Sequence, residues 1–333
     1  FPGAASVYAP PGRLRPSPRD AMTTEATVAK GEGTGWRRAL ALFVLLVLTS
    51  LVPAGMLVGV PLLILIGLGG IRNAGLLVAT VVAMFVVLSG QRDPLWYAER
   101  GWAVMLGGFF AATTLLAPRW RLTSRALAAV GGSVGGATAF YVMRSGAWSN
   151  LDWSVSDRLG AILGNFLYAL DVVREGQTVS PAFVAAVYRT IELQAAVFPA
   201  VVALESMAAL GIAWWLYRRL VFRDDEGLAS VRQFAFNDHL VWVLIAGLLL
   251  VVTGVSDGAV RVGANLAVFM TALYALRGAG VVVFVNRGLS LFGALMFVLG
   301  VLFAAPLVVG FAALLGIADT WLDLRARAEA IAG

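Results

Sequence analysis

Cysteine is absent from the 333 residues, histidine occurs once, and charged side chains make up only 13% of the sequence. The absence of cysteine excludes disulfide bonds, thiol catalysis and thiolate metal sites. A single histidine, His239, argues against a zinc site of the usual kind, so no metal ligands are expected. Soluble domains carry about 25% charged residues, so the low charge content indicates that lipid, not water, surrounds most of this chain.

Hydrophobic residues supply 60% of the sequence, and the mean hydropathy is +0.85. The net charge is +6 and the pI is about 10.1. In a soluble protein this charge would suggest nucleic acid as a partner. Here the arginines lie next to apolar runs, which is the charge bias of cytoplasmic loops in membrane proteins. We therefore expect a lipid bilayer as the partner, and no nucleic acid.

The sequence predicts one large membrane domain with short flanks. Residues 1–35 are rich in Pro, Gly, Ser and Thr and are expected to form a disordered cytoplasmic tail. Met22 is a plausible true start, which would place residues 1–21 upstream of the protein. A single transmembrane domain is expected over 36–327, with a short tail at 328–333. The longest extramembrane stretch, 144–180, is expected on the outer face as a loop with an amphipathic helix or a marginal span.

Apolar runs predict an all-α, polytopic transmembrane bundle of about eight spans in the bacterial inner membrane, with a cytoplasmic N-terminus. A span needs about 20 apolar residues, and Pro53 and Gly55 are expected to break the first run. Ser180 and Pro181 form a typical helix start. The runs are 39–71, 74–89, 101–117, 126–143, 194–219, 240–256, 260–285 and 289–316.

Two ionisable side chains fall inside predicted spans. Glu205 lies 13 residues before Arg218, which puts it roughly 20 Å along its helix from the cytoplasmic edge. Arg277 lies 10 residues before Arg287, or ~15 Å from the same edge. A carboxylate at such a depth costs about 2.5–3.5 kcal/mol unless it is protonated, paired or wetted. We expect Glu205 and Arg277 to meet, either as a substrate or proton site or as an ion pair that only fixes helix packing.

Asn265 and the glycines of span 126–143 each have two possible interpretations. Asn265 either hydrogen-bonds between helices or lines a cavity that opens outward. The glycines of span 126–143 predict close helix–helix contact, or simply reflect the tolerance of membrane helices for glycine. These glycines are Gly131, Gly132, Gly135 and Gly136. No phosphate loop, nucleophile elbow or metal-binding spacing is present, so an enzymatic role is left open but disfavoured, and no cofactor is expected.

The carboxy-terminal third resembles a known family. The motif runs Gly263-Ala-Asn265, then Leu273-Tyr-Ala-Leu-Arg-Gly278, then a run with Pro306 that closes in Leu315-Gly-Ile-Ala-Asp-Thr-Trp321. It resembles the YybS-like family of uncharacterised bacterial membrane proteins. A glutamine is common in the family at the position of Arg277. The resemblance implies a distant similarity to the substrate-binding subunits of energy-coupling-factor transporters.

That similarity implies an S-component-like core with a membrane-embedded pocket for a small molecule. It also implies partner subunits in the membrane and an ATPase that couples energy to transport. The leading hypothesis is therefore a substrate-binding or transport-related membrane subunit of unknown substrate. The rival hypothesis is a non-transporting scaffold or assembly protein, whose buried charges only set the packing of its helices.

Overall fold

The computed structural model describes residues 54–69, 94–173, 181–222, 233–286 and 291–332, and these are all helix or connecting turns, without a strand. The predicted all-α fold is therefore confirmed for the described part of the chain. The expected tail at 1–35 and the predicted span at 74–89 lie outside it. The helices are α2 (Ala54–Gly69), α4 (Pro94–Leu116), α5 (Leu122–Met143), α6 (Ala147–Val173), α7 (Pro181–Tyr217), α8 (Val241–Thr253), α9 (Asp257–Val285), α10 (Leu291–Leu322) and α11 (Leu324–Ala332).

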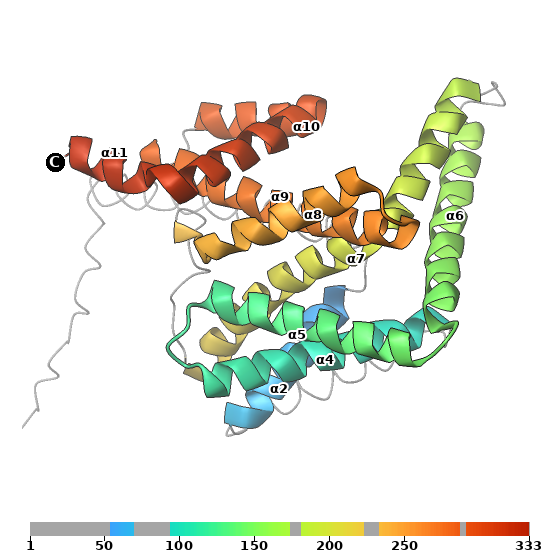
Figure 1. Cartoon of the computed structure of the whole chain (residues 1–333), viewed down its shortest axis with the longest axis horizontal. Helices are drawn as coiled ribbons and strands as arrows, with labels where there is room; N and C mark the ends of the chain where they lie inside the picture. The colour runs from blue at the N-terminus through green and yellow to red at the C-terminus, as the bar shows by residue number, and fades with distance from the viewer. Residues whose placement is uncertain (1–53, 70–93, 174–180, 223–232, 287–290, 333) are drawn as a thin grey trace, which may run out of the picture. The chain divides into compact units, whose positions relative to one another are not determined.

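Helix α7 connects the helices that precede it with those that follow. It packs against three helices that precede it in the sequence, α2, α5 and α6, and against one that follows it, α9 (Figure 1). A five-residue π-helix, Arg218–Phe222, extends its end. Pro199 lies in its interior, where proline has no N–H to donate and its ring crowds the carbonyl of the preceding turn. The chain stays helical across Pro199, and we call the missing backbone hydrogen bond alone the Pro199 break. The site described below begins at this position.

Helix α9 forms the closest contacts in the carboxy-terminal half, and glycines make them possible. A Cβ atom on Gly278 would collide with the backbone carbonyl of Ala312, and one on Gly316 with the carbonyl of Tyr274. On the other side, a Cβ on Gly263 would lie 2.6 Å from the carbonyl oxygen of Gly247. Side chains at these positions would force α9 away from both α8 and α10.

The buried core beside α9 is built mainly from α8, α9, α10 and the segment before α8. Its buried members are Phe236, Val241, Leu244, Met270, Leu273, Tyr274 and Ala313. The two phenyl rings of Phe234 and Phe236 meet edge to face, with centroids 6.0 Å apart, and Phe236 meets Tyr274 in the same way at 5.1 Å. This aromatic row anchors the segment 233–240 across the end of α9 that carries Arg277.

In the part of the chain that the structure describes, three helical stretches are long and apolar enough to cross a bilayer: Leu122–Met143, Glu192–Phe222 and Asp257–Val285. A fourth, Pro306–Leu322 with Leu324–Ala330, is bent by 70°. Shorter apolar helices cover Gly55–Leu68 and Asp238–Thr253. The expected total of about eight spans stays a prediction.

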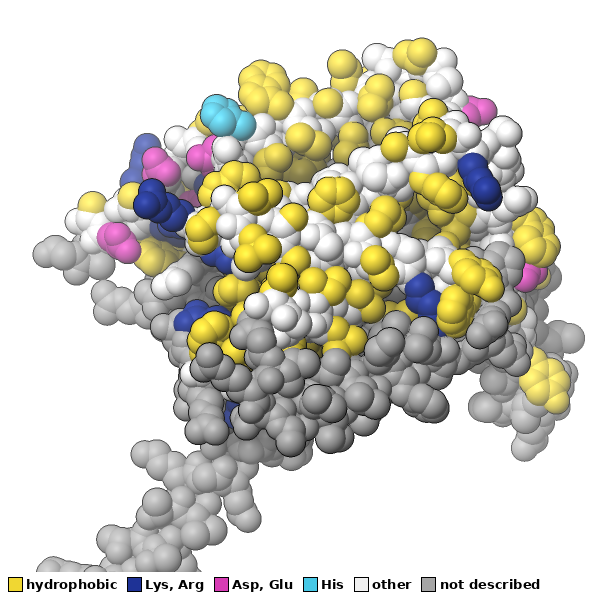
Figure 2. Space-filling model, turned by 90° about the horizontal axis from the view of Figure 1, so that it is seen from below, with side chains coloured by type: hydrophobic (Ala, Val, Ile, Leu, Met, Phe, Trp, Pro, Cys, Tyr) yellow, Lys and Arg dark blue, Asp and Glu magenta, His cyan; other side chains and the backbone are white. Residues whose placement is uncertain are grey.

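The described surface fits a lipid environment. Figure 2 shows hydrophobic side chains over much of one face, with most charged side chains toward its margins. Helix α8 alone exposes six large apolar residues: Trp242, Ile245, Leu248, Leu249, Val251 and Val252. Exposed apolar areas of this extent are unusual for soluble monomers and normal for lipid-facing helices.

Helix α2 is described from Ala54 and α7 from Pro181, each at the edge of the described residues. Helix α8 ends at Gly254, whose φ of 57° is accessible to glycine at little cost. Residues 147–173, expected on the outer face, form the single helix α6, and residues 328–332 continue α11.

Candidate functional site

Asn265 of α9 bonds to the backbone of α7 at the Pro199 break. Its Oδ1 accepts a hydrogen bond from the N–H of Ala200 at 2.9 Å, and its Nδ2 donates to the carbonyl of Ala196 at 2.8 Å. Nearby, the guanidinium of Arg261 donates to the carbonyl of Ala195 at 3.1 Å. Ala195 is the residue whose carbonyl loses its helical donor when residue 199 is proline. Both side chains therefore satisfy backbone groups next to the break, as helices broken in membranes require.

Arg261 also ties α6 to this crossing. Its Nη2 donates to Oδ1 of Asp152 on α6, and its guanidinium lies 5.3 Å from the ring centroid of Trp148. The hydrogen bond from Arg261 lowers the pKa of Asp152 below its ordinary value. Asp152 is more than a third exposed, so solvent screening limits what the pair contributes to stability. Asn265 and Arg261 of α9 thus link α7 and α6 to α9 through neighbouring polar contacts.

Replacing Asn265 by alanine is expected to lower the free energy of unfolding by about 1–2 kcal/mol, because the N–H of Ala200 and the carbonyl of Ala196 lose their partner. Asn286 on the same helix is a matched control, since it bonds only to its own helix and is exposed. Unfolding of both variants in mixed micelles checks this. A loss for Asn286→Ala as large as that for Asn265→Ala would contradict the assigned role.

Glu205 lies on α7 beyond the break, in the candidate span Glu192–Phe222. The residue is partly buried, and its Oε2 atom is buried without a hydrogen-bond partner among the described residues. The neighbouring Ser206 is engaged: its hydroxyl accepts a 2.9 Å hydrogen bond from the indole of Trp102 and donates to the carbonyl of Val202. Glu205 therefore sits beside a fixed α4–α7 contact but takes no part in it.

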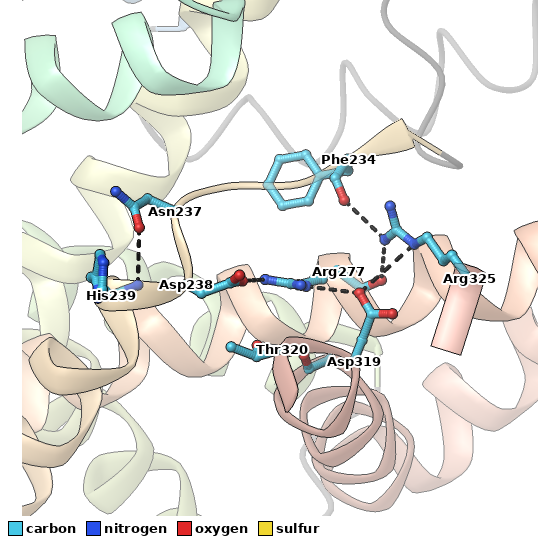
Figure 3. A network of polar contacts seen from close by, with 9 residues as sticks. Phe234, Asn237, Asp238, His239, Arg277, Asp319, Thr320 and Arg325 are labelled. Carbon is cyan, nitrogen blue, oxygen red and sulfur yellow. Dashed lines mark hydrogen bonds and ion pairs between the residues drawn. The ribbon is translucent and has the colours of Figure 1, made fainter. Parts of the chain in front are cut away.

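Arg277 lies at the centre of a separate network of charges (Figure 3). Its Nε donates to Oδ2 of Asp319 on α10 at 2.9 Å, and its Nη1 donates to Oδ1 of Asp238 at 2.6 Å. The Arg277 and Asp319 side chains are 7% and 6% exposed, whereas that of Asp238 is 59% exposed. The buried part of the network is thus one arginine–carboxylate pair, with Asp238 as its link to solvent.

A second arginine closes the network from α11. Arg325 lies 3.8 Å from the same Asp319 oxygen and donates to the carbonyls of Phe234 and Arg277 at 3.0 and 3.2 Å. The Arg277 guanidinium also lies 5.6 Å from the ring centroid of Phe236. Figure 3 shows that these groups come from the segment before α8, from α9 and from the α10–α11 bend. The network therefore holds these elements together.

The expected pairing of Glu205 with Arg277 is corrected by this geometry. Asn265 lies level with Ala196 and Ala200, and the two helices run in the same direction there. Arg277 is 12 residues beyond Asn265, whereas Glu205 is only five beyond Ala200. The side chain of Arg277 turns to α10, where Asp319 lies. Counting residues along each helix predicted similar depths, but the contacts of Asn265 put Arg277 seven residues (12 minus 5) further along its helix than Glu205, and Arg277 is directed to α10.

Sequence reasoning missed Asp319 as the partner of Arg277. The signal was present, because Asp319 is the acid at the end of the last apolar run and belongs to the Gly316–Trp321 motif. Helical side chains lean toward the helix N-terminus, so Arg277 reaches back toward the turn of Tyr274, which lies opposite Gly316. Asp319 follows Gly316 by one turn of α10.

The four glycines of α5 divide between two environments. A Cβ on Gly132 would lie 2.8 Å from the Phe109 ring of α4, and one on Gly136 would lie 3.4 Å from Met105. A Cβ on Gly131 or Gly135 would meet nothing within 4 Å. Only Gly132 and Gly136 therefore face a described neighbour. The described residues contain no group of three His, Asp or Glu side chains that could hold a metal ion.

The comparison with known families finds a match in the carboxy-terminal part of the chain. Residues 175–320 match the family model described as Predicted membrane protein (DUF2232). The match spans less than half of the 333 residues but includes Glu205, Asn265, Arg277 and Asp319. No curated protein and no solved structure matches the chain. The chain is therefore similar to a family of predicted membrane proteins, in agreement with its apolar helices.

Proposed function

We propose that this protein is a membrane-embedded, transport-related subunit that binds a cationic group or a proton at Glu205. The observation that supports the proposal is that the ionisable side chains in the candidate spans differ in whether they have a partner of opposite charge. Arg261 and Arg277 each have a carboxylate partner, whereas Oε2 of Glu205 has none among the described residues. An ionisable group inside a membrane is costly, and one that contributes no ion pair to packing indicates a ligand or proton site.

The break in α7 supports the same function. Many transporters bind substrates where helical hydrogen bonding is interrupted near the middle of the membrane. In α7 the interruption is the backbone hydrogen bond missing at Pro199, and the helix continues across it. Pro199 precedes Glu205 by six residues, so the carboxyl lies less than two turns from the break. The hydrogen bonds that Asn265 and Arg261 donate hold α7 to α9 on the other side of Pro199 from Glu205.

The finer features of the proposal rest on the family resemblance. We place the protein in the bacterial inner membrane with its N-terminus in the cytoplasm, and with an S-component-like core. Its partners would be membrane subunits and an energy-coupling ATPase, and its ligand a small molecule with a positively charged group. Function depends on the site and not on the fold, so the direct binding test below is decisive.

The rival function is a scaffold that anchors other membrane components. The network around Arg277 favours it, because both buried members of that network are fully engaged and serve packing. Under this hypothesis Glu205 would carry no ligand, and its replacement would leave any assembly partner bound.

Native mass spectrometry of protein purified in mild detergent separates the two functions. We expect a small cationic molecule to remain bound to the wild-type chain and to be lost, or at least tenfold weaker, in Glu205→Gln, because a hydrogen bond to a charged group contributes about 1.5–3 kcal/mol, which exceeds that factor. Glu192→Gln is the matched control, since Glu192 is exposed on the same helix. Equal ligand retention in all three proteins would contradict the proposal.

A further inference from the structure

The turn between α4 and α5 and the end of α7 bring several arginines to one corner. Arg119 and Arg121 are exposed in the turn, and Arg219 is exposed in the π-helix that follows α7. Arg125 joins the two places, because its guanidinium lies 5.3 Å from the ring centroid of Trp214 on α7. Helices α5 and α7 are also packed against each other. The corner therefore carries several positive charges on packed elements.

The turn is held rigid by Arg125 rather than by the two exposed arginines. The Nε of Arg125 donates to the carbonyl of Trp120 at 2.9 Å, and its Nη2 donates to the carbonyl of Pro118 at 2.7 Å. The guanidinium of Arg125 thus bonds to backbone carbonyls. Arg119 and Arg121 form no ion pair with a carboxylate within the described residues. Arg219 contacts the Trp215 ring, at 5.5 Å, and likewise has no carboxylate partner there. Exposed cations without a carboxylate partner among the described residues attract an anion.

Apolar side chains surround these charges. Leu115, Leu116 and Trp120 are exposed next to Arg119, and Leu220 and Phe222 are exposed next to Arg219. A soluble anion would gain nothing from this apolar border, while an amphiphile would place its acyl chains against it. Aromatic residues and arginines at the end of a span are the usual position of lipid headgroups. The pattern fits a ligand with a phosphate at one end and hydrocarbon at the other.

We infer that Arg119, Arg121 and Arg219 form a binding site for the phosphodiester headgroup of an anionic phospholipid. Basic clusters between membrane helices on the cytoplasmic side are suited to such headgroups. The site is separate from Glu205 and does not depend on any transport function. It would fix the depth of α4, α5 and α7 in the leaflet through a charged contact in addition to burial of apolar surface.

The test compares lipid binding by full-length protein in detergent, using native mass spectrometry with phosphatidylglycerol and phosphatidylcholine. We expect phosphatidylglycerol to bind more tightly, and Arg119→Gln/Arg121→Gln to weaken it roughly 25-fold, at about fivefold for each charge. The control Arg144→Gln/Arg327→Gln removes two other exposed arginines, at the C-terminal end of α5 and in α11, and should leave binding within twofold of wild type. Arg125 is left intact in every variant, so the turn keeps its hydrogen bonds.

Three results would overturn the inference. The first is equal affinity for the two lipids, and the second is an equal loss in both double variants, which would indicate only net charge. The third is competition by inorganic phosphate as effective as that by phosphatidylglycerol, which would make the corner a site for a soluble anion. An Arg119→Lys/Arg121→Lys variant that keeps most of the lipid binding would show that charge, and not the fold of the turn, was lost.

Discussion

Replacing Asp319 by alanine is expected to lower the free energy of unfolding by about 3–5 kcal/mol, because it leaves the buried guanidinium of Arg277 without its buried partner. The cost falls toward the lower end of that range, since Asp238 still accepts from Nη1 of Arg277. Arg325 also loses the carboxylate that faces it. Chemical unfolding of the variants in mixed micelles measures the loss.

Two further variants distinguish the stability contributed by the buried Arg277–Asp319 pair from that contributed by the exposed Asp238. Asp238→Asn should cost no more than about 1 kcal/mol, because the Asp238 side chain is 59% exposed and its charge is screened. The double change Arg277→Met/Asp319→Leu should recover most of the stability, since it removes both charges together and keeps apolar volume. A loss for Asp238→Asn equal to that for Asp319→Ala would show that burial does not govern this network.

Replacing Gly278 by alanine is expected to be nearly as damaging, at about 3 kcal/mol, because overpacking against backbone cannot be relieved by a rotamer change. The new Cβ would collide with the carbonyl oxygen of Ala312 and lie 2.9 Å from the backbone nitrogen of Gly316. Helices α9 and α10 would have to separate, which would also lengthen the contact of Arg277 with Asp319. Thermal unfolding in detergent measures the effect.

Gly310 offers a matched control on α10. A Cβ at Gly310 meets nothing within 4 Å, so Gly310→Ala should be neutral, or stabilising by up to about 1 kcal/mol from helix propensity. Similar melting of Gly278→Ala and Gly310→Ala proteins would mean that α9 and α10 do not approach as closely as the structure has them.

Much of the helical organisation could be predicted from the sequence, because it depends on local chemistry. Apolar runs longer than a bilayer crossing predict helices, and Gly254 marks where α8 ends. The same reasoning identified Asn265 as a candidate for hydrogen bonding between helices. It could not assign the partner of Asn265. The backbone groups next to Pro199 come within reach of Asn265 only because α7 and α9 cross at that level.

Asp319 stands out in the sequence, but its pairing with Arg277 depends on helix packing for a related reason. Depth along a helix can be counted in residues, but the rotation of each helix about its axis is set by packing against all its neighbours. Gly278 and Gly316 bring α9 and α10 so close that Arg277 is directed to Asp319. Glu205 is left on a helix whose described neighbours present it with no cation, and this is why a binding role is proposed for it.

The unfolding free energy of Glu205→Gln in mixed micelles tests most directly whether Glu205 serves a ligand or the fold. If the carboxyl is a binding group, neutralising it removes no ion pair, so the variant should be as stable as the wild type or slightly more stable. A loss of about 3–5 kcal/mol, comparable to that expected for Asp319→Ala, would show that Glu205 is a structural tie and would contradict the proposed function.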